Sequence, residues 1–177
     1  MAMTKIERRL VVAGIICLPL AAVAFYAAGL RINNTASIPL GIYQMSYDAP
    51  RRGDLVMACP TDAPVFVDAQ ARGYIGSGPC GNGMSPLMKR LVAIKGDRVA
   101  FTADGVVVNG LRLKDSRPME SDPSGRAMPQ VRSPTQTVPT GSVLLMGIDS
   151  PKSFDGRYYG LIPQNQITAL IRPVLTW

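Results

Sequence analysis

An uninterrupted apolar run near the N-terminus constrains this chain more than any other feature. Residues 10–30 carry no charged side chain, and three basic residues precede them. A helix of that length would be about 31 Å long, which matches the roughly 30 Å hydrocarbon core of a membrane. We therefore predict a cytoplasmic basic segment at 1–9, a transmembrane anchor at 10–30 and a single domain at 31–177 outside the cytoplasm.

A cleaved secretory signal is the alternative interpretation of the same run. The small residues of Ala22-Val23-Ala24 form an acceptable cleavage site, and Pro19 could end a short apolar core just before it. The run continues past that point to Leu30, which favours the anchor. Under either interpretation the domain lies on the periplasmic side of the inner membrane, close to membrane lipid.

The three cysteines agree with that compartment. Cys17 lies inside the apolar run, which leaves Cys59 and Cys80 in the rest of the chain. A disulfide between these two would close a loop of about 22 residues and could contribute about 3 kcal/mol in the chain-entropy model. Two unpaired thiols are the alternative. The absence of C-x-x-C spacing argues against a metal site.

The composition excludes several classes of site. The chain contains no histidine, so neither a Ser-His-Asp nor a Cys-His arrangement is possible, and histidine metal sites are excluded. We predict no metal and no cofactor. The net charge of +7 is spread along the chain without a helix-turn-helix, zinc or aromatic-basic motif. A basic surface that faces anionic lipid is favoured over nucleic-acid binding.

From Gly41 onward, short β-like runs alternate with glycine and proline, which predicts a mainly antiparallel β domain. The predicted strands are 41–47, 54–59, 87–94, 98–102, 105–108, 142–147 and 166–172. Residues 115–141 are rich in proline, serine and arginine, so we expect a long excursion there and no second domain.

Ser37 is a candidate nucleophile that would lie close to the membrane surface. Pro39 and Gly41 follow it, so its hydroxyl is expected on a stiff, non-helical segment. Because the chain has no histidine, its base would have to be a carboxylate or a lysine whose pKa is lowered by burial. A polar linker that leads into the first strand is the alternative interpretation of this segment.

Lys89 is the candidate base because it lies within the apolar segment 86–94, whereas the other lysines of the domain lie at turns or in polar loops. Strand alternation places Lys89 and Arg90 on opposite faces, so one can be buried while the other stays in water. Burial would lower the pKa of the lysine, as a general base at neutral pH requires. The alternative is an edge-strand charge that prevents aggregation.

Taken together, these segments resemble the type I signal peptidase family of membrane-anchored serine peptidases. The resemblance is carried by four blocks in the family's order, at 37–39, 52–56, 88–99 and 153–160. It implies a fold of coiled antiparallel β-sheets, in agreement with the strands expected from the pattern of residues.

The resemblance also implies roles for individual side chains. Ser37 would be the nucleophile and Lys89 the general base. Thr35 would supply a hydroxyl to an oxyanion hole together with the backbone amide of Ser37. The residues expected to support this site, by orienting the lysine or by stabilising its surroundings, are Ser153, Asp155 and Arg157.

Two departures from the family pattern concern the C-terminal block. Residues 147–150 read Gly-Ile-Asp-Ser where general signal peptidases have Gly-Asp-Asn-Arg, and Gly156 stands where they usually have serine. Within the family, the short chain and the sequence at 154–163 most resemble the TraF-type peptidases of plasmid conjugation systems. That resemblance implies processing of a membrane-embedded pilin precursor, with possible joining of its ends. The alternatives are a general signal peptidase that acts on preproteins and a noncatalytic envelope assembly protein.

Overall fold

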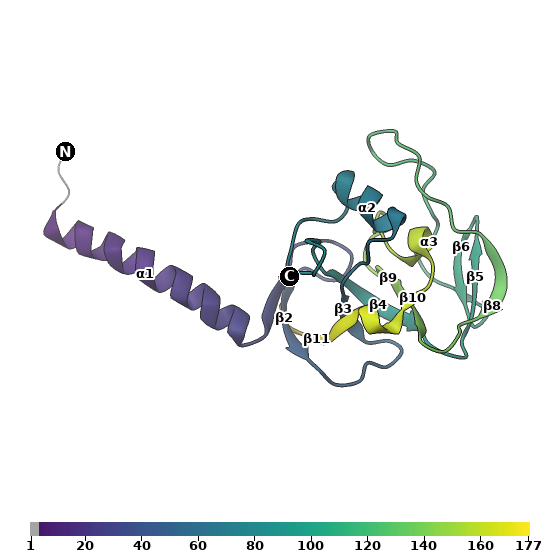
Figure 1. Ribbon diagram of the computed structural model, residues 1–177, viewed down its shortest axis with the longest axis horizontal. Helices are drawn as coiled ribbons and strands as arrows, with labels where there is room; N and C mark the ends of the chain where they lie inside the picture. The colour runs from purple at the N-terminus through teal and green to yellow at the C-terminus, as the bar shows by residue number, and fades with distance from the viewer. Residues whose placement is uncertain (1–3) are drawn as a thin grey trace.

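The computed structural model describes residues 4–177, apart from the side chains at 9, 10, 12–14 and 16. The first three residues of the basic segment expected at 1–9 therefore lie outside the described residues. Two antiparallel sheets form the body of the molecule, and helix α1 (Lys5–Ala27) projects away from them (Figure 1). The prediction of a mainly antiparallel β fold is confirmed.

Helix α1 begins at a capping box. The Glu7 amide donates to the Thr4 hydroxyl at 3.2 Å, and the Thr4 amide donates to the Glu7 carboxylate at 2.8 Å, so two otherwise unpaired donors are satisfied. The helix ends at Ala27, and Gly29 follows with a φ of +77°, a conformation that favours glycine. Strand β1 (Leu30–Asn33) begins directly after this turn.

The segment predicted as a transmembrane anchor, 10–30, differs from the helix at both ends. The cap at Thr4 starts the helix earlier, and the turn at Gly29 places Leu30 in a strand. Within residues 4–177, no helix combines the length and the apolar character needed to cross a membrane. The anchor at 10–30 therefore stays a prediction.

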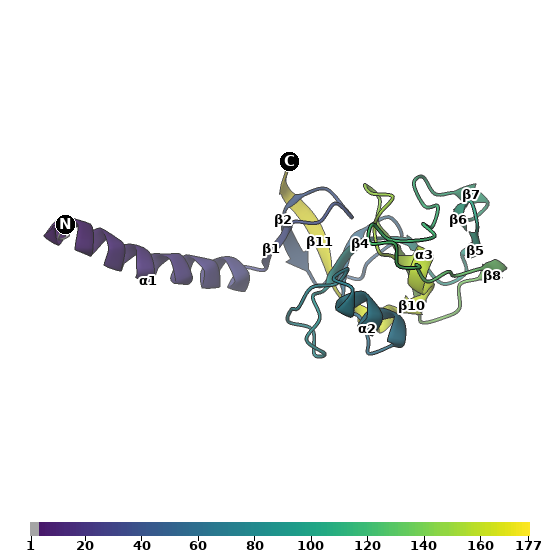
Figure 2. The same ribbon diagram turned by 90° about the horizontal axis from the view of Figure 1, so that it is seen from above.

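The larger sheet has seven strands in the order β1-β2-β11-β3-β4-β9-β10. Its remaining strands are β2 (Gly41–Ser46), β3 (Leu55–Ala58), β4 (Leu87–Ala93), β9 (Ser142–Met146), β10 (Ile162–Pro163) and β11 (Ile167–Thr176). The smaller sheet has the order β7-β6-β5-β8, and it lies at the end of the body away from α1 (Figure 2). Its strands are β5 (Arg98–Thr102), β6 (Gly105–Val108), β7 (Leu111–Arg112) and β8 (Ser133–Thr137).

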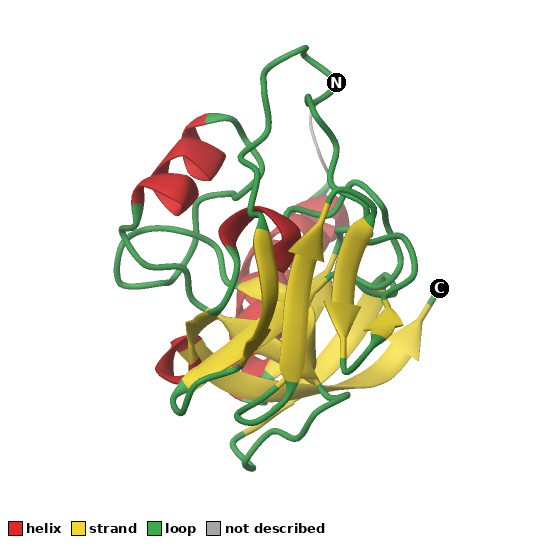
Figure 3. Cartoon of the chain, turned by 90° about the vertical axis from the view of Figure 1, so that its right-hand side faces the viewer, coloured by secondary structure: helices red, strands yellow, loops and turns green. Residues whose placement is uncertain are grey.

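Three short helical elements accompany the sheets in the described part of the chain, and Figure 3 shows the helices in red beside the yellow strands. They are α2 (Pro64–Ala71), α3 (Gly156–Tyr159) and the 3-10 turn η1 (Gln164–Gln166). Helix α2 starts with a proline at its first position, where the missing amide costs no hydrogen bond. It buries Phe66 and Ala69 against the larger core.

Strand β9 joins the two hydrophobic cores because both of its faces are covered. Val143 and Leu145 pack in the core that also contains Phe66 and Tyr158, whereas Leu144 and Met146 pack in the core of the smaller sheet. The alternation of side chains along a strand sends successive residues into different cores. The C-terminal end of β9 is therefore held rigidly, and the site described below begins there.

All seven predicted strands are present, with ends that differ by a few residues. The largest difference is β11, which continues to Thr176, beyond the predicted end at 172. The expected excursion at 115–141 contains β8, which pairs with β5. Strand β8 has the sequence Ser-Pro-Thr-Gln-Thr and is mostly exposed, so it shows no apolar alternation from which it could be predicted.

Cys59 and Cys80 form a disulfide, with their Cα atoms 5.6 Å apart. This bond ties the loop that follows α2 to the end of β3. Within this loop, the backbone amides of Gly78, Cys80 and Gly83 donate hydrogen bonds to carbonyls of the same loop. The open alternative of two unpaired thiols is thus decided in favour of the bridge.

Candidate active site

Ser37 lies in the loop between β1 and β2, and its neighbour Ile38 is fully buried. The Ser37 carbonyl accepts a hydrogen bond from the Ile148 amide at 2.8 Å, just past the end of β9. Ser37 itself is 8% exposed. The serine is therefore presented from a non-helical segment, as predicted, and its loop is fixed to the segment that directly follows β9.

Lys89 reaches Ser37 from β4. It pairs with Val56 of β3, and the strand alternates so that Lys89 is buried while Arg90 points the other way and donates to the Gly53 carbonyl. The Lys89 Nζ atom lies 2.5 Å from Ser37 Oγ. The alternative of an edge-strand charge is wrong, because β4 lies between β3 and β9.

Ser153 completes a triangle of polar atoms. Its Oγ lies 3.0 Å from Ser37 Oγ and accepts from Lys89 Nζ at 3.1 Å. Gly147 makes this approach possible, because a Cβ atom at that position would lie 2.2 Å from Ser153 Oγ. The first residue of the altered 147–150 segment is thus required by the position of Ser153.

Asp155 and Arg157 form a fully buried ion pair behind this triangle. Arg157 Nε and Nη2 donate to the two carboxylate oxygens at 2.8 and 2.9 Å, and the Gly147 amide donates to the same carboxylate at 2.8 Å. Arg157 also donates to the carbonyls of Asp115 and Pro151. The pair therefore ties β9, α3 and the excursion together at the site.

The surroundings of Lys89 lower its pKa to about 8. Burial is the main cause, because it disfavours the charged ammonium. The Asp155 carboxylate acts in the opposite direction and the Arg157 guanidinium in the same direction as burial. A substantial fraction of Lys89 is therefore uncharged in mildly alkaline solution, where an ordinary lysine is fully protonated.

Thr35 lines the cleft in front of Ser37 and Lys89 that is described below, but its hydroxyl is engaged in another contact. Its hydroxyl donates to Asn33 Oδ1 at 2.9 Å. Within residues 4–177, no hydrogen bond joins Thr35 to Ser37. To serve an oxyanion, the Thr35 hydroxyl would have to exchange Asn33 for the new acceptor, so its implied role stays a prediction.

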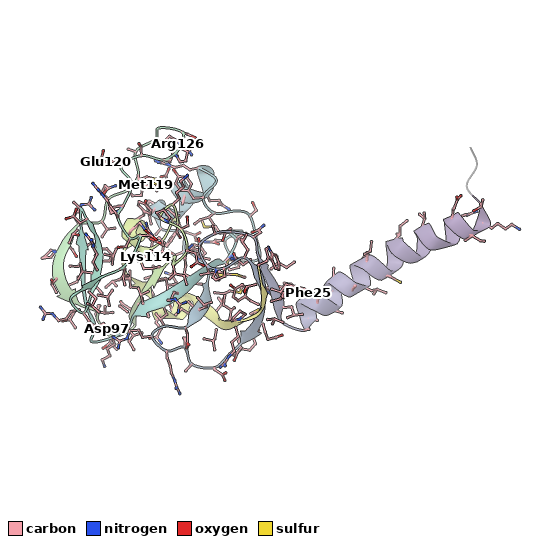
Figure 4. The ribbon with its side chains drawn as sticks, turned by 180° about the vertical axis from the view of Figure 1, so that it is seen from behind. Phe25, Asp97, Lys114, Met119, Glu120 and Arg126 are labelled. Atoms are coloured by element: carbon pink, nitrogen blue, oxygen red, sulfur yellow. A yellow bond between two sulfur atoms is a disulfide. The ribbon has the colours of Figure 1, made fainter. Side chains whose placement is uncertain are left out.

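Two buried polar residues, Asn33 and Asp122, have no sequence motif that could have found them. Asn33 is buried at the end of β1. Asp122 is buried in the excursion, where it accepts from the Tyr74 hydroxyl and from Arg126 Nε. Arg126 and the neighbouring Met119 and Glu120 lie on the part of the excursion seen at the top of Figure 4. The Tyr74 hydrogen bond is the main reason why the pKa of Asp122 lies well below its usual range.

A cleft of about 840 Å³ opens in front of Ser37 and Lys89. Apolar side chains line much of it, and these include Met45, Met57, Ile75, Leu87 and Met88. The disulfide-tied loop forms one wall through Gly76 and Pro79. Within the described residues, no group of acidic residues and cysteines could hold a metal ion. The cleft can accommodate an apolar, extended peptide segment.

These contacts define a candidate Ser/Lys site of the type found in peptidases. The model of the family "Signal peptidase, peptidase S26" matches residues 5–177, and the chain belongs to that family. It is 47% identical to a plasmid transfer protein TraF of Escherichia coli, over 98% of this chain and 97% of that protein. It is 36% identical to a conjugal transfer protein TraF of Agrobacterium fabrum, over 100% and 99% of the two chains. A solved signal peptidase I of Enterococcus faecalis is 20% identical with a TM-score of 0.40, over 72% of this chain and all of that one.

Proposed function

We propose that this chain is a Ser/Lys peptidase that processes the pilin precursor of a plasmid conjugation system. The observation that carries the proposal is the 2.5 Å approach of Lys89 Nζ to Ser37 Oγ inside the cleft. Relatives named as plasmid and conjugal transfer proteins match nearly the whole chain, which supports a role in conjugation. The membership of a peptidase family supports the chemistry.

In the proposed reaction, neutral Lys89 takes the proton of Ser37 as Ser37 Oγ attacks the carbonyl carbon of the scissile bond. The Lys89 ammonium then gives that proton to the leaving amine, and an ester remains on Ser37. The Ser153 hydroxyl holds the Lys89 amine in place by accepting a hydrogen bond from Nζ. The Ser37 amide and the Thr35 hydroxyl would donate to the oxyanion, and one such donor is typically worth about 3 to 4 kcal/mol.

Processing is expected to depend on pH through Lys89. Only the uncharged amine can accept the serine proton, so the rate should fall as the pH drops below the Lys89 pKa of about 8. The measurement is kcat/KM for precursor cleavage as a function of pH, and well below the midpoint each pH unit should cost about tenfold. A rate that stays flat down to pH ~5 would point to a carboxylate base instead.

We further propose that the Ser37 ester is released by the amino terminus of the same pilin, which joins the pilin ends head to tail. An amine held close to the ester competes with water because of its high effective concentration. Attack forms an amide bond, breaks the ester and returns the proton to Ser37. The intact mass of mature pilin tests this step: a cyclic product is one water lighter than the linear chain. A linear product with free termini would leave peptidase activity but contradict cyclisation.

The two alternative functions give different products. A general signal peptidase would remove an N-terminal segment from unrelated preproteins. A noncatalytic assembly protein would not be acylated at Ser37 by a reactive inhibitor. Mass spectrometry of the cleaved pilin, together with the labelling of Ser37, distinguishes all three functions.

We also propose that α1 attaches the chain to the inner membrane, with residues 31–177 on the periplasmic side. Exposed apolar side chains on the described part of α1 support the attachment, and they include Ile15, Leu18, Leu20 and Val23. The disulfide supports an oxidising compartment. A thiol reagent applied to whole-cell protein should label Cys59 and Cys80 only after reduction. Labelling without reduction would place the domain in the cytoplasm.

A further inference from the structure

Asn33 is a buried polar residue at the end of β1, directly before the loop that carries Ser37. Its side-chain amide donates to the backbone carbonyls of Thr35, Ile38 and Pro39 at 2.8, 3.0 and 2.9 Å. Its Oδ1 atom accepts from the Thr35 amide at 3.2 Å and from the Thr35 hydroxyl at 2.9 Å. One side chain therefore holds the backbone on both sides of Ser37.

The loop needs such a partner because it forms no regular ladder of its own. Buried carbonyls require donors, and Pro39 has no amide to offer a neighbour. The Ser37 carbonyl is held by the Ile148 amide, and the Pro39 carbonyl also accepts from the Tyr43 hydroxyl at 2.6 Å. The remaining carbonyls of Thr35 and Ile38 turn inward to Asn33. A carboxamide carries two donor hydrogens, so its three carbonyl acceptors share them.

The position of Ser37 relative to Lys89 depends on this loop. Lys89 is fixed by β4, which lies between two other strands, whereas Ser37 is fixed by contacts that Asn33 makes with the loop backbone. A displacement of about 1 Å between reacting groups can cost on the order of a hundredfold in rate. Asn33 is therefore placed to control reactivity through the loop backbone, without a hydrogen bond to Ser37 Oγ or Lys89 Nζ.

We propose that Asn33 is a positioning residue that sets Ser37 against Lys89 and holds the Thr35 hydroxyl beside the nucleophile. The inference rests on the proposed function, because it assigns the residue to the same Ser/Lys site. In the free protein the Thr35 hydroxyl donates to Asn33. When an oxyanion forms, the hydroxyl turns to it, while the Thr35 amide stays with Asn33 and keeps the side chain in place.

The test compares variants of the full chain in their reaction with a fluorescent β-lactam, which acylates an activated serine. Asn33→Ala removes all contacts, whereas Asn33→Asp keeps the acceptor for Thr35 but loses the donors. Both should lower the maximal rate of acylation by about a hundredfold and leave the half-saturating probe concentration within about twofold of wild type. In Asn33→Ala, which adds no charge, the midpoint of the pH profile should stay that of wild type, because the burial of Lys89 is unchanged.

Asn82→Ala is the matched control. The Asn82 side chain also donates to a backbone carbonyl, that of Pro60, and its Oδ1 atom accepts from the Met84 amide two residues later. Unlike Asn33, Asn82 does not line the cleft. Its replacement should leave the acylation rate unchanged. Acylation of both Asn33 variants at the wild-type rate would overturn the proposal. An equal loss in the Asn82 variant would do the same, because it would assign the loss to general destabilisation.

Hydrogen exchange gives a second readout that needs no catalysis. The Ile148 amide is bonded to the Ser37 carbonyl, so it should exchange at least about tenfold faster in Asn33→Ala if Asn33 orders the loop. Leu145, in the middle of β9, should keep its wild-type protection. Unchanged protection at Ile148 would overturn the inference. If wild type and Ser37→Ala are labelled equally by the probe, the proposed function fails, and hydrogen exchange still decides whether Asn33 orders the loop.

Discussion

Replacing Lys89 or Ser37 with alanine is expected to lower pilin processing by at least about a thousandfold, and the double variant should lose no more than either single one. Residues that act as one catalytic unit show this non-additive behaviour, because either removal abolishes the same step. The measurement is the rate of precursor cleavage by each purified variant. Lys95→Ala is the control, since Lys95 is exposed at a turn after β4 and should keep full activity. Full activity in Lys89→Ala together with a loss in Lys95→Ala would assign the base to Lys95.

The same residue allows catalysis and stability to be separated. The pKa of Lys89 is about 8 in the folded protein, compared with 10.5 for an unperturbed lysine, so the unfolded chain binds more protons between these values. Stability should therefore rise with pH from about 8 to 10.5, and below that window burial of the ammonium costs about 3 kcal/mol. Lys89→Met should be inactive, yet more stable than wild type at neutral pH. If Lys89→Met is inactive because it has unfolded, its loss of activity would not be evidence that Lys89 takes part in catalysis.

The pattern of residues and the family resemblance together led to the candidate pair, because each supplied information that the other lacked. The apolar segment around Lys89 predicted a strand, and alternation along that strand predicted that one of Lys89 and Arg90 is buried. The absence of histidine then left few partners for a serine. The family resemblance chose Ser37, and the structure brings it to Lys89.

The parts that could not be predicted depend on contacts between distant segments. Arg157 binds the carbonyl of Asp115, about forty residues earlier, and no local pattern records that contact. Asn33 acquires its partners only when the loop turns back on it. The family resemblance implied Thr35 as a free donor, whereas the structure gives its hydroxyl to Asn33. Gly156, where serine is usual, packs so closely on Leu144 that a Cβ atom would lie 2.4 Å from its side chain.

Replacing Arg157 with alanine is expected to lower the free energy of unfolding by about 3 to 5 kcal/mol, because it leaves the Asp155 carboxylate buried without its cation. The carbonyls of Asp115 and Pro151 lose a donor at the same time. The measurement is the urea midpoint and slope of each variant. Arg172→Ala is the control: Arg172 pairs with Asp48 at 3.6 Å, both side chains are about 70% exposed, and such pairs contribute about 0 to 1 kcal/mol.

The Asp155–Arg157 pair should also act on the pH profile, with a sign that depends on which partner is removed. Asp155 raises the pKa of Lys89 and Arg157 lowers it. In the fraction of Arg157→Ala that stays folded, the rate midpoint should therefore move to higher pH, because the carboxylate remains uncompensated. Asp155→Asn should move the midpoint to lower pH. Shifts in the same direction for both variants, or none, would show that the pair supports the fold without tuning the lysine.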